Sequence, residues 1–139
     1  MAKPQNILVS IDGSDNALRA LKFSLSLVQP GGRIHLLYVQ VPVARSWVLS
    51  EELIEEHYRR QEEAALKKVR GYLKRAKGRI PIQVCIGEPA PTIVEYARKK
   101  RCTQIVMGNR GHGAIAGMFL GSVAMKVVQL SEIPVTLVK

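Results

Sequence analysis

The sequence contains little cysteine and no long apolar run, and each absence excludes a class of protein. Its 139 residues include two cysteines, Cys85 and Cys102, which do not form a Cys-x-x-Cys pair. Two cysteines outside any metal or redox motif indicate reduced structural thiols rather than a disulfide framework. No apolar run approaches the roughly 20 residues that a membrane-spanning helix needs. We therefore expect neither a disulfide scaffold nor a membrane span.

Targeting and repeat signals are also missing. Residues 1–6 lead directly into a strand-like segment and lack the apolar core of a secretory signal peptide. We therefore expect a cytoplasmic protein. No internal repeat, low-complexity tract or linker divides the chain, and its length suits one folded unit. Residues 1–139 are predicted to form a single domain.

Acidic residues are scarce relative to basic ones. The chain has 11 Asp and Glu against 21 Lys and Arg, a net charge of +10. This balance favours anionic partners such as nucleotides, nucleic acid or anionic lipid. The basic residues concentrate at 59–79 and 98–101. A solvated helix face, contact with nucleic acid, contact with a membrane surface and docking of an unknown protein partner all fit this pattern.

Apolar segments of two different periodicities alternate along the chain. Short β-branched runs predict five strands, at residues 7–11, 34–41, 79–86, 104–107 and 133–138. Segments of helical spacing predict four helices between them, starting at Ser14 or Asp15, at Ser50, after residues 87–90 and at Phe119. This alternation predicts an α/β fold, a five-stranded parallel open sheet with helices on both faces. Pro81 predicts that the third strand lies at an edge or begins after the proline.

A glycine-rich segment follows the fourth predicted strand. Five glycines occur in residues 108–121, the first and last residues included, and the last predicted helix overlaps the end of this segment. Glycine lets a ligand approach the backbone amides, and amides at a helix N-terminus bind anions. Arg110, His112 and Ser122 add donors, so the segment suits a polyphosphate. Open sheets bind ligands beyond the carboxyl ends of their strands, so the loops after strands one and four are the expected place.

Familiar nucleotide and catalytic motifs are absent. Residues 111–117 read G-x-G-x-x-x-G, one residue longer than the dinucleotide fingerprint, and no P-loop sequence occurs. Ser122 has no nucleophile-elbow sequence around it and no adjacent base, so it reads as a phosphate ligand. The histidines lack metal-ligand spacing. On glycine content alone, a flexible loop without a ligand is the alternative interpretation.

The glycine spacing is more specific than the glycine content. Gly108-x2-Gly111-x9-Gly121-Ser122 matches the G-2x-G-9x-G-[S/T] signature, so the chain resembles the ATP-binding subclass of universal stress proteins. The resemblance implies a Rossmann-like sheet of the adenine nucleotide alpha hydrolase type. It extends over the whole chain, through residues 7–14, 36–39, 87–90, 105–108 and 133–135.

Two positions depart from the family pattern. Ser10 stands where the family often has proline, and Thr103 stands where an acidic residue is common. We expect the first change to reshape the turn after strand one. We expect the second to affect packing more than ligand binding.

The resemblance implies a binding site without catalytic residues or protein-only metal ligands. Its implied ligand is ATP, with Mg²⁺ or Mn²⁺ on the phosphates. Asp12 would contact the adenosine side and Val39 the adenine, although Asp12 also reads as an ordinary turn residue. The implied cofactor-binding residues are Asp12, Val39, Met107, Gly108, Arg110, Gly111, Gly121, Ser122 and Val123.

The implied role is that of a nucleotide-dependent sensor or regulator in stress response or signalling. Slow ATP hydrolysis or autophosphorylation is one alternative, although no general base, water-positioning Gln or arginine finger is evident. A nucleic-acid-binding module using the basic helix at 59–79 is another, although no RRM, KH or helix-turn-helix signature supports it. Family members commonly dimerise through the last strand. We therefore expect a homodimer through residues 133–138.

Overall fold

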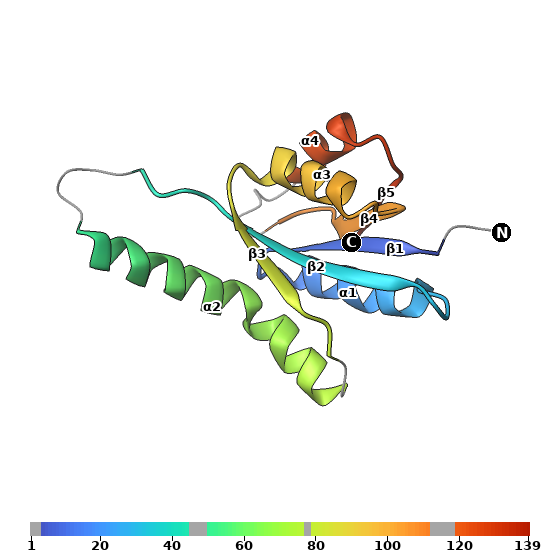
Figure 1. Cartoon of the computed structure of the whole chain (residues 1–139), viewed down its shortest axis with the longest axis horizontal. Helices are drawn as coiled ribbons and strands as arrows, with labels where there is room; N and C mark the ends of the chain where they lie inside the picture. Colours follow the sequence, from blue (N-terminus) through green and yellow to red (C-terminus); the bar gives the residue numbers. More distant parts are fainter. Residues whose placement is uncertain (1–3, 45–49, 77–78, 112–118) are drawn as a thin grey trace.

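The chain folds around one parallel sheet covered by helices on both faces (Figure 1). This computed structural model describes residues 4–44, 50–76, 79–111 and 119–139. The strands are β1 (Asn6–Ile11), β2 (Arg33–Gln40), β3 (Ile82–Ile86), β4 (Gln104–Gly108) and β5 (Val135–Val138). The helices are α1 (Asp15–Leu27), α2 (Glu51–Arg75), α3 (Pro89–Lys99) and α4 (Ser122–Leu130). The predicted fold class is confirmed.

The strand order determines where the chain changes direction. The five strands lie in the order β3-β2-β1-β4-β5, and every neighbouring pair is parallel. The chain winds from β1 to one edge, then crosses back and continues from β4 to the other edge. β3 and β5 are therefore the edge strands, and β3 begins after Pro81, as the proline predicted.

Each face of the sheet has its own apolar core because strand side chains alternate in direction. Ile7 and Val9 pack with Leu21 of α1 and Leu66 of α2. Leu8, between them, packs on the opposite face with residues of α3 and α4. Figure 1 shows the same division, with α1 and α2 on one side of the sheet and α3 and α4 on the other. Within the described ranges, no helix is long and apolar enough to span a bilayer.

Serine side chains begin the first two helices. The hydroxyl of Ser14 accepts a hydrogen bond from the backbone N–H of Ala17 at 3.0 Å. The hydroxyl of Ser50 accepts one from Leu53 at 3.2 Å. Such caps satisfy amides that the first helical turn leaves unpaired. The predicted starts of both helices are confirmed.

The last helix and the last strand begin later than predicted. α4 starts at Ser122 rather than at Phe119. The residues before it are held by Asn109, whose side-chain amide donates to the carbonyl of Phe119 at 3.0 Å and whose carbonyl accepts from Gly121 N–H at 2.7 Å. β5 starts at Val135 rather than at 133, because a turn closed by Ser131 precedes it. The apolar periodicity of the sequence carries no information about these polar contacts, so it placed the starts of α4 and β5 too early.

Candidate functional site

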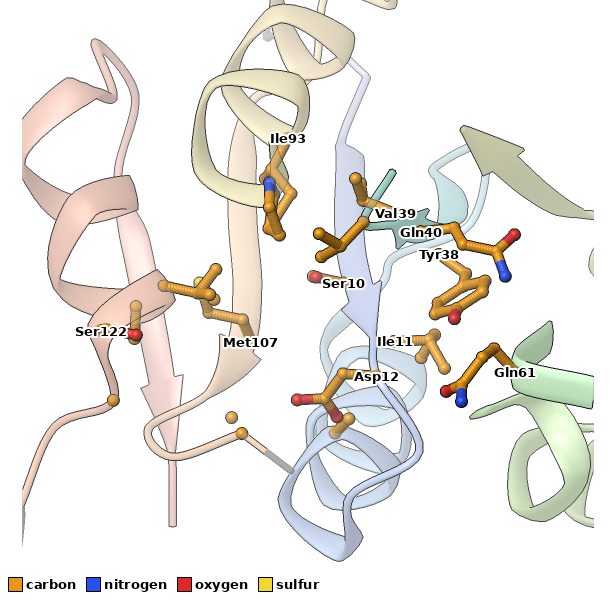
Figure 2. Close-up of a pocket in the computed structure, with 18 of the residues that line it drawn as sticks. Ser10, Ile11, Asp12, Tyr38, Val39, Gln40, Gln61, Ile93, Met107 and Ser122 are labelled. Carbon is orange, nitrogen blue, oxygen red and sulfur yellow. The ribbon is translucent and has the colours of Figure 1, made fainter. Parts of the chain in front are cut away.

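A cavity of about 490 Å³ opens at the carboxyl ends of β1, β2 and β4. It lies where the chain winds away from β1 and β4 in opposite directions, which leaves a crevice between their following loops. The loops after strands one and four therefore both line it, as predicted. Figure 2 shows residues from β1, β2, α3, β4 and α4 turned toward the same space.

The cavity extends around the end of the sheet rather than lying on one face. Ser10 and Ile11 are consecutive on β1, so their side chains leave opposite faces, and both line the cavity. Figure 2 places Met107 and Ser122 on one side of β1, and Tyr38 and Gln61 on the other. The first side is the face of α3 and α4, and the second is the face of α2.

Asp12 closes the turn after β1. Its Oδ1 accepts hydrogen bonds from the backbone N–H of Ser14 at 2.9 Å and from the Ser14 hydroxyl at 2.5 Å. The same hydroxyl caps α1, so the carboxylate supports the start of that helix. The interpretation of Asp12 as a turn residue is therefore confirmed. Its other oxygen, Oδ2, faces Gly111 across the cavity mouth.

The first glycines of the signature stand at close approaches of the backbone. A Cβ at Gly108 would lie 2.7 Å from the Cβ of Asn16 and 3.0 Å from its carbonyl carbon. A Cβ at Gly111 would lie 2.7 Å from Oδ2 of Asp12. A side chain at Gly108 would collide with the start of α1, and one at Gly111 would displace the Asp12 carboxylate, so both glycines let the loop after β4 lie close to the loop after β1.

The amino end of α4 supplies backbone donors to the cavity. Gly121 is the N-cap residue and makes no side-chain cap hydrogen bond, and the first turn contains no acidic residue. Ser122, Val123 and Ala124 begin the helix and line the cavity. Unpaired amides and the helix dipole together give this end partial positive charge. The arrangement suits a phosphate or another anion.

The charges around the cavity are uneven. Among its described lining residues, Asp12 is the one carboxylate and none is lysine or arginine. Burial raises the pKa of Tyr38, and the nearby carboxylates of Glu62 and Asp12 raise it further. Neutral backbone and hydroxyl donors, rather than cationic side chains, therefore face a ligand in the described part of the cavity.

The structure brings together all but one of the predicted binding residues. Those that line the cavity are Asp12, Val39, Met107, Gly108, Gly111, Gly121, Ser122 and Val123. Arg110 is exposed and outside the lining, and its carbonyl accepts from the side chain of Asn16 at 3.4 Å. His112 lies outside the described residues.

Sequence reasoning missed the residues that line the α2 face. Tyr38 and Gln40 could have been found from strand alternation, because they flank the predicted Val39 on β2. His57 and Gln61 belong to α2 and carried no local signal, since polar helix residues usually face solvent. Tertiary packing alone brings them to the cavity.

A hydrogen-bond chain fastens α2 to the end of β2. Gln40 is buried, and its side-chain amide donates to the carbonyl of Tyr58 at 2.8 Å. The hydroxyl of Tyr58 accepts from the backbone N–H of Val43 at 2.9 Å. Tyr58 thus connects α2 to both the end of β2 and the loop that follows it.

Comparison with known proteins relates this architecture to one family. Residues 3–139 match the model of the universal stress protein family. A universal stress protein of Thermus aquaticus is 36% identical over 139 residues, which cover 97% of this chain and 98% of the relative. The solved universal stress protein UspA of Lactobacillus plantarum shares the fold, with a TM-score of 0.85 at 23% identity over the whole of both chains.

A further solved structure contains a ligand. It is a universal stress protein in complex with cAMP, 26% identical to this chain, with a TM-score of 0.63. The match covers 99% of this chain and 98% of that one. Adenine nucleotide binding therefore occurs in a protein of the same fold and similar sequence.

Proposed function

The chain belongs to the universal stress protein family, and on that premise we propose that its cavity binds ATP. The observation that carries the proposal is the meeting of the signature residues at one cavity, beside the uncapped N-terminus of α4. We propose that the bound nucleotide makes the protein a regulator or sensor in stress response. The related complex with cAMP supports an adenine nucleotide as the ligand class.

The adenosine and the phosphates of the nucleotide would contact different kinds of groups. The adenosine would lie between Val39 and Met107, with Asp12 accepting from its hydroxyl groups. The phosphates would lie at the first turn of α4, on the amides of Ser122 and Val123 and the Ser122 hydroxyl. Arg110, on the loop after β4, stays a predicted phosphate contact.

A divalent cation fits this site only as a companion of the phosphates. No cluster of three or more His, Cys, Asp or Glu residues that could hold a metal occurs among residues 4–44, 50–76, 79–111 and 119–139. Asp12 is the one carboxylate in the described lining. Mg²⁺ commonly binds through substrate phosphates, one or two carboxylates and water. We therefore propose that the phosphates supply most of the ligands to Mg²⁺ or Mn²⁺.

The geometry supports binding over rapid hydrolysis. Gln61 could position a water molecule, but Figure 2 places it across β1 from Ser122 and from the amino end of α4. His57 lies one helical turn before Gln61 on α2, the helix on the opposite face of the sheet from α4. Phosphoryl transfer requires such groups next to the reacting phosphate.

A homodimer through residues 133–138 is part of the proposal. β5 is an edge strand, and its four residues are all partly exposed. Unpaired strand edges invite pairing, and a twofold partner closes the edge. Met125 and Val128 of α4 add exposed apolar surface. Sedimentation should show a dimer, and a strict monomer would overturn this part.

The test of the nucleotide proposal is thermal stability with and without Mg-ATP. At a ligand concentration of about 100 times Kd the stabilisation should be about 2.7 kcal/mol. For a chain of this size the melting temperature should rise by roughly 5–10 °C. GTP and pyrophosphate serve as ligand controls.

Two site variants and one matched control make that test specific. Ser122→Ala removes a hydroxyl with little steric change, and Gly121→Asp places a negative charge at the proposed phosphate position. Gly71→Asp introduces the same side chain on α2, away from the cavity lining. The ATP shift should shrink in the first two variants and persist in the third. An equal shift in all proteins would contradict the proposed site.

A further inference from the structure

A second cavity lies at the other end of the sheet, beside the amino ends of β2 and β3. Its volume is about 360 Å³. Because all strands are parallel, this end is opposite the cavity at their carboxyl ends (Figure 1). Its polar lining consists of Arg33, His35, Arg79, Gln83 and Tyr96, and no described lining residue carries a carboxylate.

The two arginines come from the start of β2 and from the segment before β3. Arg33 and His35 are two residues apart on β2, so their side chains leave the same face of the sheet. In the register, Leu37 of β2 pairs with Gln83 of β3. Arg79 lies in the segment just before β3, and both Arg33 and Arg79 line the cavity.

The cations here lack acidic partners. Arg33, Arg79 and Lys100 form no ion pair with any described residue, although Arg98 and Lys99 nearby both pair with Glu95, at 2.5 and 3.9 Å. Like charges gathered in a hollow raise the local concentration of anions. The cluster is therefore positively charged and available to a ligand.

His35 has an unfulfilled hydrogen-bonding atom at the same place. Its Nε2 is buried and has no hydrogen-bond partner among the described residues. Buried polar atoms are nearly always paired, so an unpaired one calls for an explanation. The ring meets Tyr96 of α3 edge to face, with centroids 6.4 Å apart, and Lys100 Nζ lies 5.9 Å from the centroid of the Tyr96 ring. Burial lowers the pKa of His35, and the charges of Lys100 and Arg33 lower it further.

We propose that this cavity binds a small phosphate-bearing anion, held by the guanidinium groups of Arg33 and Arg79 together with the imidazole of His35. One guanidinium group can donate two parallel hydrogen bonds to two phosphate oxygens. This geometry favours phosphate over a compact monovalent anion. The anion would balance the positive charge of the two arginines. It would also favour the protonated form of His35, whose ring N–H would then donate a hydrogen bond to the anion. Leu36 and Ile80 in the lining could cover the organic part of a phosphomonoester.

The experiment follows His35 directly by NMR in the full-length protein. Inorganic phosphate and phenyl phosphate are titrated separately at constant ionic strength, with sodium chloride as the control salt. Binding should shift the imidazole signals of His35 saturably and raise its pKa, because an anion stabilises the protonated ring. His57, at the other cavity, is the internal reference.

Matched variants separate binding from a general charge effect. The double variant Arg33→Gln, Arg79→Gln removes both guanidinium groups, and Lys67→Gln, Arg75→Gln removes two exposed cations of α2 that do not line the cavity. We expect affinity to fall at least tenfold in the first and to change less than twofold in the second.

The outcomes are distinct. Saturation with inorganic phosphate alone supports a free phosphate ligand, and tighter binding of phenyl phosphate supports an organic phosphomonoester. A response of His35 that matches chloride, that survives unchanged in Arg33→Gln, Arg79→Gln, or that appears only at His57 would overturn the proposal. None of these results depends on whether ATP binds at the other end of the sheet.

Discussion

Gly111 and Asp12 are in such close approach that a Cβ on the glycine would lie 2.7 Å from Oδ2 of the carboxylate. These residues belong to the loops after β4 and β1, which are far apart in sequence. Their approach closes one side of the cavity. A side chain at this glycine of the signature would therefore displace the neighbouring carboxylate.

Gly111→Ala tests that relationship. The added methyl group should displace the Asp12 carboxylate or the loop, and ATP affinity should fall about tenfold or more in titration calorimetry, a loss of about 1.4 kcal/mol. Gly71→Ala is the control, because its Cβ would meet only the end of Arg75 at 3.4 Å. It should leave affinity unchanged and raise stability by roughly 0.5–1 kcal/mol. Unaltered affinity in Gly111→Ala would argue against contact between this loop and the ligand.

Asp12 has a turn role in the structure and a ligand role in the proposal, and two substitutions separate them. Asp12→Asn keeps an oxygen that can accept from Ser14, so stability should change by less than about 1 kcal/mol. Loss of the charge-assisted contact should still weaken ATP binding about tenfold. Asp12→Ala removes the acceptor as well and should lower stability by about 1–2 kcal/mol. Wild-type affinity in the asparagine variant would leave Asp12 as a turn residue only.

Tyr58→Phe tests the connection between α2 and the loop after β2. The variant removes the hydroxyl that accepts from Val43 N–H at 2.9 Å. Leaving that amide unpaired should lower the free energy of unfolding in urea by about 1 kcal/mol. Tyr72→Phe, on the same helix, is the control, because its hydroxyl makes no hydrogen bond among the described residues. Equal losses in both variants would contradict a specific role for the Tyr58 hydroxyl.

Cys102 should make folding stability fall in alkali. Burial raises the pKa of its thiol from 9.0 to about 11, against a smaller opposite effect of Lys100. The unfolded chain therefore loses this proton first, and stability is lost as pH rises from about 9 to about 11. The loss should reach about 2–3 kcal/mol at most. Urea unfolding at pH 8 and pH 11 should show a steeper decline for the native protein than for Cys102→Ala, and parallel declines would contradict the assignment.

The sequence predicted the sheet well because the apolar periodicity of a strand or helix reflects which of its side chains are buried in the core. It failed where polar contacts override periodicity, as at Phe119, whose apolar side chain suggested a helix although Asn109 holds its carbonyl outside one. The Thr103 hydroxyl accepts from Asn6 N–H at 3.0 Å and donates to Asn6 O at 3.1 Å, a contact between β1 and the segment before β4 that the sequence pattern did not predict.

The site was predicted on one face only. Glycine spacing is local in sequence and therefore identified the β4–α4 half of the cavity. Gln61 reaches the cavity through the packing of α2 against the sheet, which no short motif encodes. Arg110 shows the converse, because a basic residue inside the signature need not face the space that the glycines enclose.

The length of α2 lets a single helix border two separate hollows. The helix has 25 residues, so it is about 37 Å long, and His57 and Gln61 in its first half line the cavity at the carboxyl ends of the strands. Near its end, Leu73 packs against the sheet and Lys74 faces a hollow that also contains Arg79. Between these two regions, the buried residues Ala65, Leu66 and Val69 hold the helix against the sheet. One continuous helix thus borders two hollows of different chemistry, one beside Asp12 and the other beside Arg79.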